Sequence, residues 1–406
     1  MKKLMIMAIL LVASAAAFAG DSDGLKAIKK AKTYAEAEQL LKQNLDQLEG
    51  SWEKAEAYNH LTDLAYEAWN TEDNKRMLQQ PFDENLLSSM AINALKSAME
   101  CDKYDQMPNK KGKVDPDFHK DNQKRMGNIR LAVINAGVDA ANSGDNAKGH
   151  EAFLLYLNSA KHSLFADDET IKTDPNLGLA SFYAGRCAIL MDDYASAIND
   201  LDVALTDTAE QIRDGAFDFK LYAMRMNQKT AADSVQYLKD IQALAAKYPN
   251  NEKVFANLGD AYMQRGLDAD LAQICNDRLA ADPQDALGHI YLGMIAMNAK
   301  NYQEAIDRFG RIPETNTNFL PVTFNRGVCR LNLASDFLET HANKNTGVMK
   351  PDDDAKIKQM LSDAKVDLAK ARELDPDQQN VRWAVLLRNI YYQLGEEAKY
   401  QELENM

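Results

Sequence analysis

The sequence predicts an all-α protein built from repeated helix pairs. Three glycines, Gly259, Gly293 and Gly327, lie 34 residues apart, each in the first half of a predicted helix-turn-helix unit. A fixed period of this length is typical of repeat architectures, in which each unit packs on its neighbours. Pro249 and Pro283 close two of the units, because proline cannot continue the hydrogen-bond ladder of a helix. No stretch of any length shows the apolar–polar alternation of a half-buried strand.

The first 19 residues have the features of a secretory signal peptide. Two lysines follow the first methionine, residues 4–17 are apolar, and a small-x-small cleavage site ends at Ala19. The apolar run is shorter than a membrane span, and no cysteine follows it, which disfavours a lipid anchor. We therefore expect cleavage near Ala19 and a mature chain without a membrane span. Its expected location is periplasmic or secreted, with the periplasm of a Gram-negative bacterium favoured.

The charge balance excludes one class of partner. The chain has 47 basic and 61 acidic residues, for a net charge of −14, and loss of Lys2 and Lys3 with the signal peptide makes this −16. An acidic surface repels nucleic acid and anionic lipid. We expect no nucleic-acid partner.

The four cysteines are not expected to form disulfides. Cys101, Cys187, Cys275 and Cys329 fall in different repeat units that are not adjacent. Their Cα atoms should therefore lie beyond the bridging limit of about 7 Å. We predict that they are small, buried, apolar side chains.

Residues 20–406 are predicted to form one continuous array of helix pairs. Small residues let two helices approach closely, and a large residue on the partner helix fills the remaining space. Residues 25–48 are expected to form a capping helical pair and residues 381–404 a final helical cap. The clearest units cover 178–211, 218–251, 252–285, 286–319 and 320–378, and degenerate units cover 25–103 and 130–163.

Three segments interrupt the period. Residues 70–85 are expected to lengthen a loop between two helices, and the polar residues 104–124 to be mobile. The largest insertion, 333–363, should be a loop flanked by two lengthened helices. The acidic residues Asp352 to Asp354 would then begin the second helix, where negative charge favours the positive end of the helix dipole.

One unit carries a family resemblance. The residues Leu287, Gly288, Tyr291, Leu292, Gly293 and Ala296, followed by Tyr302, Ala305 and Phe309, are similar to the motif of the tetratricopeptide repeat (TPR) family. The resemblance implies a right-handed superhelical solenoid of antiparallel helix pairs. It also implies that one face of each first helix lines a concave groove that holds a segment of a partner protein.

That face can be located by helical spacing. Positions −6, −3, +1 and +4 from each repeat glycine share one side of a helix. They are mostly apolar here, and methionine and aromatic side chains suit an adaptable binding surface. The candidate groove residues are Phe182, Arg186, Phe219, Tyr222, Met226, Met263, Ile290, Met294, Met297, Phe324 and Val328. The alternative is that this stripe packs against neighbouring helices or against the long insertion.

Two departures from the family pattern matter. Some TPR proteins grip a terminal carboxylate with Lys, Asn and Arg on this face, whereas this chain has apolar and aromatic residues there, so that mode is not expected. Arg326 and Arg330 occupy positions that normally face the interior. Either the register slips near the insertion, or the arginines pair with acids such as Asp336 or Asp352 to Asp354.

The sequence contains no recognisable catalytic or cofactor motif. The six histidines are scattered, and zinc, phosphate-loop, dinucleotide and nucleophile-elbow patterns are absent. Asp352 to Asp354 and Asp375 to Asp377 lack the spacing of a calcium loop, and we interpret them as helix caps. We predict a non-enzymatic scaffold that binds another protein, without metal or cofactor. The alternatives are a glycan or small-ligand binding protein and, on the carboxylates alone, a hydrolase.

Overall fold

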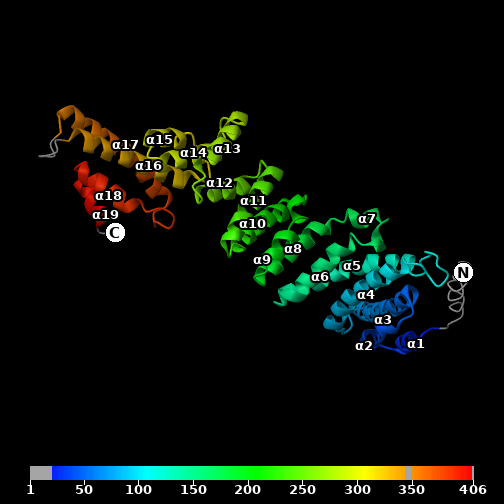
Figure 1. Ribbon diagram of the computed structural model, residues 1–406. Coiled ribbons are helices and arrows are strands. Elements are labelled where there is room, and N and C mark those ends of the chain that lie inside the picture. Colours follow the sequence, from blue (N-terminus) through cyan, green and yellow to red (C-terminus); the bar gives the residue numbers. More distant parts are fainter. Residues whose placement is uncertain (1–20, 343–348, 405–406) are drawn as a thin grey trace, which may run out of the picture. The chain divides into compact units, whose positions relative to one another are not determined.

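The computed structural model describes residues 21–342 and 349–404, and within them the regular structure is helical and contains no strand (Figure 1). The all-α prediction is therefore confirmed. The signal-peptide prediction, residues 1–19, lies outside the described residues, as do residues 343–348 of the largest insertion. No described helix is long and apolar enough to cross a membrane.

The chain divides into two compact units, with the boundary between Asp233 and Ser234. The first holds α1 (Asp23–Lys30), α2 (Tyr34–Asn44), α3 (Ser51–Met77), α4 (Glu84–Asp105), α5 (His119–Asn142), α6 (Asn146–Ser159), α7 (Glu169–Lys172), α8 (Asn176–Leu190), α9 (Tyr194–Asp200) and α10 (Glu210–Met226). The second holds most of α11 (Ala231–Lys247), then α12 (Glu252–Met263), α13 (Asp268–Ala281), α14 (Ala286–Asn298), α15 (Tyr302–Phe309), α16 (Phe319–His341), α17 (Pro351–Leu374), α18 (Trp383–Gln393) and α19 (Glu397–Glu404).

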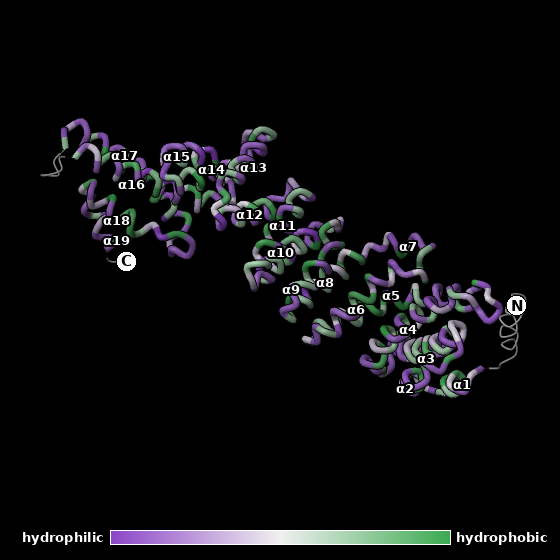
Figure 2. Tube along the Cα trace, in the orientation of Figure 1, coloured by the Kyte–Doolittle hydropathy of each residue, from purple (hydrophilic) through white to green (hydrophobic). Residues whose placement is uncertain are grey.

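Within each unit, consecutive helices pack together in pairs. The pairs are α1–α2, α3–α4, α5–α6 and α8–α9 in the first unit, and α12–α13, α14–α15, α16–α17 and α18–α19 in the second. Along most helices, hydrophobic and hydrophilic residues are interspersed (Figure 2). This pattern gives each helix an apolar side for its neighbours and a polar side for water.

A glycine in the first helix and a large residue in the second define the packing of the pairs. The large residue follows 16 positions later: Phe153 after Gly137, Leu201 after Gly185 and Phe309 after Gly293. A Cβ at Gly293 would lie 2.5 Å from the Phe309 ring, so no other residue fits without movement. In the pair α12–α13 the residue at this position is the small Cys275, and Tyr291 of α14 covers Gly259 instead.

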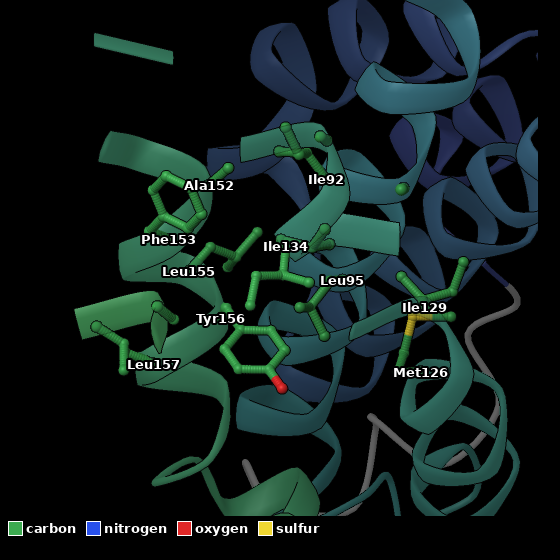
Figure 3. Packing of buried hydrophobic residues seen from close by; sticks show 14 of the residues in the cluster. Ile92, Leu95, Met126, Ile129, Ile134, Ala152, Phe153, Leu155, Tyr156 and Leu157 are labelled. Atoms are coloured by element: carbon green, nitrogen blue, oxygen red, sulfur yellow. The ribbon is translucent and has the colours of Figure 1, made fainter. Parts of the chain in front are cut away.

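The core of the first unit is continuous from α3 to α8. Figure 3 shows Ile92 and Leu95 meeting Ile134 and Tyr156 in one apolar cluster. Arg130 of α5 lies within this core, and only 2% of its surface is exposed. Its guanidinium donates to Ser159 Oγ at 2.8 Å and to Asp174 Oδ2 at 2.8 Å, which joins α5 to α6 and to the segment before α8.

Two of the predicted interruptions have a different structure. Residues 70–77 continue α3 as helix rather than loop, and Lys75 pairs with Glu72 at 2.7 Å within that turn. Residues 104–124 are tied down at their end, because the buried Asp105 carboxylate accepts the backbone N–H groups of Asp117, Phe118 and His119 at 2.9–3.0 Å. A single carboxylate thus fixes the start of α5.

The third interruption has lengthened helices on both sides of the insertion, α16 to His341 and α17 from Pro351, with Asp352 to Asp354 in the first turn of α17. Gly327 packs against Leu368, a separation of 41 residues instead of 16. The same contact forms after 25 additional residues, so the register does not slip.

Arg326 and Arg330 pair with an acid that the sequence analysis did not name. Both reach Asp367 of α17, which is 1% exposed, at 2.6 Å and 2.9 Å. The pairing with Asp336 or Asp352 to Asp354 was therefore wrong. Asp367 precedes Leu368, the residue that packs on Gly327, so the helix contact itself brings this carboxylate to the arginines.

The predicted unit 218–251 is also divided differently. Its first helix, α10, begins at Glu210 and packs on α8 and α9 in the first unit. Gly215, upstream of the predicted boundary, lies under the Phe182 ring. The second helix, α11, belongs mainly to the second unit.

All four cysteines are buried free thiols. Burial raises the pKa of Cys275 to about 12 and that of Cys329 to about 11, so both remain protonated at neutral pH.

Two glycines of α5 test the rule that a glycine is needed where a large residue of the paired helix packs against the first helix. Gly137→Ala places a Cβ 2.9 Å from the buried Phe153 ring and should lower the free energy of unfolding by about 1–3 kcal/mol. Gly127→Ala is the matched control, since its Cβ meets nothing within 4 Å, and it should raise stability by about 0.5–1 kcal/mol. Urea unfolding followed by circular dichroism measures both. Equal effects of the two substitutions would contradict the rule.

The Asp367 network gives a second stability prediction. Asp367→Ala should lower the free energy of unfolding by about 1–3 kcal/mol, because two arginines lose their buried acceptor. Asp354→Ala removes an exposed pair with Lys358 on the same helix and should change stability by less than about 1 kcal/mol. If urea denaturation shows similar losses for both variants, the Asp367 pairs do not hold α16 to α17.

Candidate functional site

The second unit has a groove along the predicted face of its first helices. The groove has a volume of about 520 Å³ and lies over α12, α14 and α16. Its apolar floor comes from Leu287, Ile290 and Met294 of α14, with Pro321 of α16 at one side. We call this surface, defined by Lys253, Ala256, Asp260, Leu287, Ile290, Met294, Pro321 and Asn325, the α14 groove.

Helical spacing explains which residues face the α14 groove. Positions 253, 256 and 260 of α12 and positions 287, 290 and 294 of α14 are the −6, −3 and +1 sites of the repeat, which share one side of a helix. Two of the candidate residues, Ile290 and Met294, are brought together here. That they bind a partner stays a prediction.

Polar groups from α12 and from the start of α16 also line the groove, and the sequence analysis did not name them as site residues. The Tyr291 hydroxyl lies 2.7 Å from the carbonyl oxygen of Ala256 and 2.9 Å from Asp260 Oδ1, so it links α14 to α12. Burial, together with the neighbouring Asp260 carboxylate, raises the pKa of Tyr291 well above its usual range. Tyr291 is not at one of the four positions used to predict the groove face. Its ring covers Gly259 because Cys275 is too small to do so.

The start of α14 is held by a capping carboxylate. Asp285 Oδ1 accepts the Gly288 N–H at 2.6 Å, and Asp285 Oδ2 lies 2.5 Å from Arg278 Nη2 of α13. Burial alone raises the pKa of Asp285, but the Arg278 guanidinium and the Gly288 amide outweigh burial, and the pKa lies below its usual value of 3.8. This cap sets the position of the groove floor on α14.

Three candidate residues pack within the fold, as the alternative interpretation states. The Phe182 ring of α8 and the Phe219 ring of α10 have centroids 5.3 Å apart, so they join two neighbouring helices of the first unit. Phe324 of α16 packs against the buried cluster around Trp383 and Leu387. For these residues packing is the role that the structure shows.

The remaining candidates are spread along the helices. Tyr222 and Met226 of α10 are 38% and 44% exposed, and Arg186 of α8 is exposed as well. The other three, Met263 of α12, Met297 of α14 and Val328 of α16, are half-buried and stand outside the lining of the α14 groove.

The corresponding face of the first unit is polar where α3 meets α5. A hollow of about 600 Å³ there is lined by residues that include Asp63, Asp121, Lys124 and Arg125. Arg125 Nη1 donates to Asp63 Oδ1 at 2.7 Å. An apolar segment would strip water from these charges, which is costly, so this hollow is a poorer match for the predicted partner than the α14 groove.

Only one of the two acidic motifs caps the chain: Asp352 to Asp354 lie in the first turn of α17, where no side chain forms a cap hydrogen bond, whereas Asp375 holds the turn after α17. Asp375 is 4% exposed, and its carboxylate accepts the backbone N–H groups of Gln379, Asn380 and Val381 at 2.8–2.9 Å. Burial raises its pKa, but these three amides lower it below its usual range. Among the described residues, no group of three or more His, Cys, Asp or Glu side chains could hold a metal ion.

No protein-family model matches the sequence, and no curated protein matches it. A structure titled Naa15/Naa10 bound to HypK-THB is similar over 94% of this chain and 62% of the matched chain, so the match spans less than two thirds of that protein, at 14% identity and a TM-score of 0.29.

Two further structures give similar values. The TPR domain of P58(IPK) is similar over 94% of this chain and 96% of that chain, at 13% identity and a TM-score of 0.29. A monomeric mutant of IFIT1 with Gppp-AAAA covers 91% of this chain and 84% of its own, at 13% identity and a TM-score of 0.29. TM-scores this low support no argument, so the fold rests on the helix pairs described above.

The Asp285 cap predicts a pH dependence. Because the folded pKa lies below the unfolded value of 3.8, the cap contributes stability that is present above 3.8 and is lost as the pH falls through the folded pKa. Asp285→Asn keeps a capping side chain but removes the titration. The difference in unfolding free energy between wild type and variant should be constant between about pH 7 and pH 5 and shrink toward about pH 3. A difference that does not vary with pH would contradict this role.

Proposed function

We propose that this protein is a non-catalytic scaffold that holds a segment of another protein in the α14 groove. The observation that carries the proposal is the groove itself, an apolar floor of Leu287, Ile290 and Met294 with polar groups at its side. Apolar pockets rimmed by a few polar groups suit an extended or helical peptide, and methionine adapts its shape to different partners.

The polar residues that line the groove can fix the orientation of such a segment. Lys253 and Asp260 come from α12, and Asn318 and Asn325 come from the start of α16. Polar groups of this kind can hydrogen-bond a peptide backbone while the peptide side chains contact the apolar floor. The absence of catalytic motifs from the sequence supports a non-catalytic role.

The location is also part of the proposal. The basic start, the apolar run and the small-x-small site ending at Ala19 support export. On this view the partner is another protein of the bacterial cell envelope, and the acidic surface keeps the scaffold apart from nucleic acid.

Photo-crosslinking tests the proposal. A photoreactive amino acid in place of Asn325 should crosslink one envelope protein, and Met294→Glu with Pro321→Glu should reduce its capture at least about 10-fold, equivalent to about 1.4 kcal/mol. Phe324→Glu is unsuitable, because Phe324 packs against the buried cluster around Trp383 and Leu387.

Val366→Glu is the matched control for this experiment. Val366 is 64% exposed on α17 and lies outside the groove, so capture should be unchanged. Capture that survives the Met294 and Pro321 substitutions would rule out the α14 groove as the binding site.

A further inference from the structure

A second hollow of the second unit lies between α11, α12 and α13. Its volume is about 690 Å³, larger than that of the α14 groove and within the range of ligand sites, about 300–1,000 Å³. Phe255, Leu258 and Tyr262 of α12 form one wall, Ile274 of α13 a second, and Ala245 of α11 a third. We call it the α11–α13 hollow.

The two sites use opposite faces of α12. At about 100° per residue, positions 255, 258 and 262 point roughly opposite to positions 253, 256 and 260, which line the α14 groove. Glu252, the first residue of α12, lines both hollows, but their apolar lining residues are different, so this proposal does not depend on the proposed function.

The charges around the hollow are almost all negative. Its lining contains four carboxylates and one cation, Arg278. Arg278 is already engaged: it pairs with Asp285 at 2.5 Å, donates to the Pro249 carbonyl at 3.0 Å, and lies 4.1 Å from the centre of the Phe255 ring. It closes one end of the hollow and is not available to an anionic ligand.

The other three carboxylates have no cation. Glu252, Asp277 and Asp282 are exposed, and within the described part of the chain none of them has an ion-pair partner. Asp277 accepts only from the Gln273 amide at 2.8 Å, and Asp282 only from the Gln284 N–H at 2.9 Å. The rim thus presents uncompensated negative charge next to apolar and aromatic walls.

We propose that the α11–α13 hollow binds a segment of a partner protein in which apolar side chains are flanked by lysine or arginine. The apolar side chains contact Phe255, Leu258 and Ile274, and the cations reach Glu252, Asp277 and Asp282. Lysine and arginine have apolar stems that pack on aromatic faces, with charged ends that remain at the rim. The net charge of −14 attracts such a segment from a distance.

Fluorescence anisotropy with a labelled peptide of leucine and lysine tests this site on the full chain. The wild type should bind it, and binding should weaken as salt is added. A matched peptide with glutamate in place of lysine should not bind. Absence of leucine–lysine binding, or equal binding of both peptides, would overturn the proposal.

Two kinds of variant distinguish binding in the α11–α13 hollow from general attraction of the peptide to the acidic surface. Ala245→Trp fills the hollow without a change of charge, and Glu252→Gln with Asp277→Asn removes two rim charges while keeping side-chain shape. Each should weaken binding at least about 10-fold. Asp282 is left intact because it holds the turn before α14. If Ala245→Trp does not fold, as judged by circular dichroism, the rim variant decides.

Met294→Glu is the control that separates the two sites. It should leave the affinity for the leucine–lysine peptide unchanged while it disrupts the α14 groove. Loss of peptide binding in Met294→Glu with retention in Ala245→Trp would assign the peptide to the α14 groove and reject the α11–α13 hollow.

Discussion

The close contact between a glycine of one helix and a large side chain of the next is the constraint on which this structure depends. It sets how near the two helices of a pair approach, and it therefore sets which side of each first helix remains uncovered. The contact recurs with the same spacing at Gly137, Gly185 and Gly293, and it still forms at Gly327 after the long insertion. The helix pairs therefore keep a common register. The exception is informative: with Cys275 in place of a large residue, Tyr291 fills the space and ties two pairs together.

Buried carboxylates perform the second structural task, which is to hold the irregular segments. Asp105 and Asp375 each accept three backbone N–H groups, and Asp367 gathers two arginines. Each replaces water as the partner of polar groups that burial would otherwise leave unsatisfied. Part of the acidic composition is thus structural, and only the exposed carboxylates are available to attract a partner.

In the second unit these constraints leave α12 between two hollows of different character. One side, towards α14, has an apolar floor and mixed polar groups, and the other, towards α11 and α13, has aromatic walls and an acidic rim. A helix that carries two such faces suits a protein whose role is to hold other chains. The Arg278–Asp285 pair serves both, because it caps α14 and closes the end of the hollow.

The sequence by itself determined the helical class, the period, the lengthened helices at the insertion and the side of α14 that faces outward, because these follow from local spacing and from residue size. It did not determine that Phe324 and Phe182 pack against neighbouring helices, that Asp367 pairs with the arginines, or that α10 and most of α11 belong to different units. The sequence does not show whether an apolar side chain is covered, because exposed and buried apolar residues have the same chemistry. Helical spacing gives the face of a residue but not the helix that packs against that face. Only the tertiary contacts, which depend on residues distant in the chain, decide where a surface is covered and where it is left open.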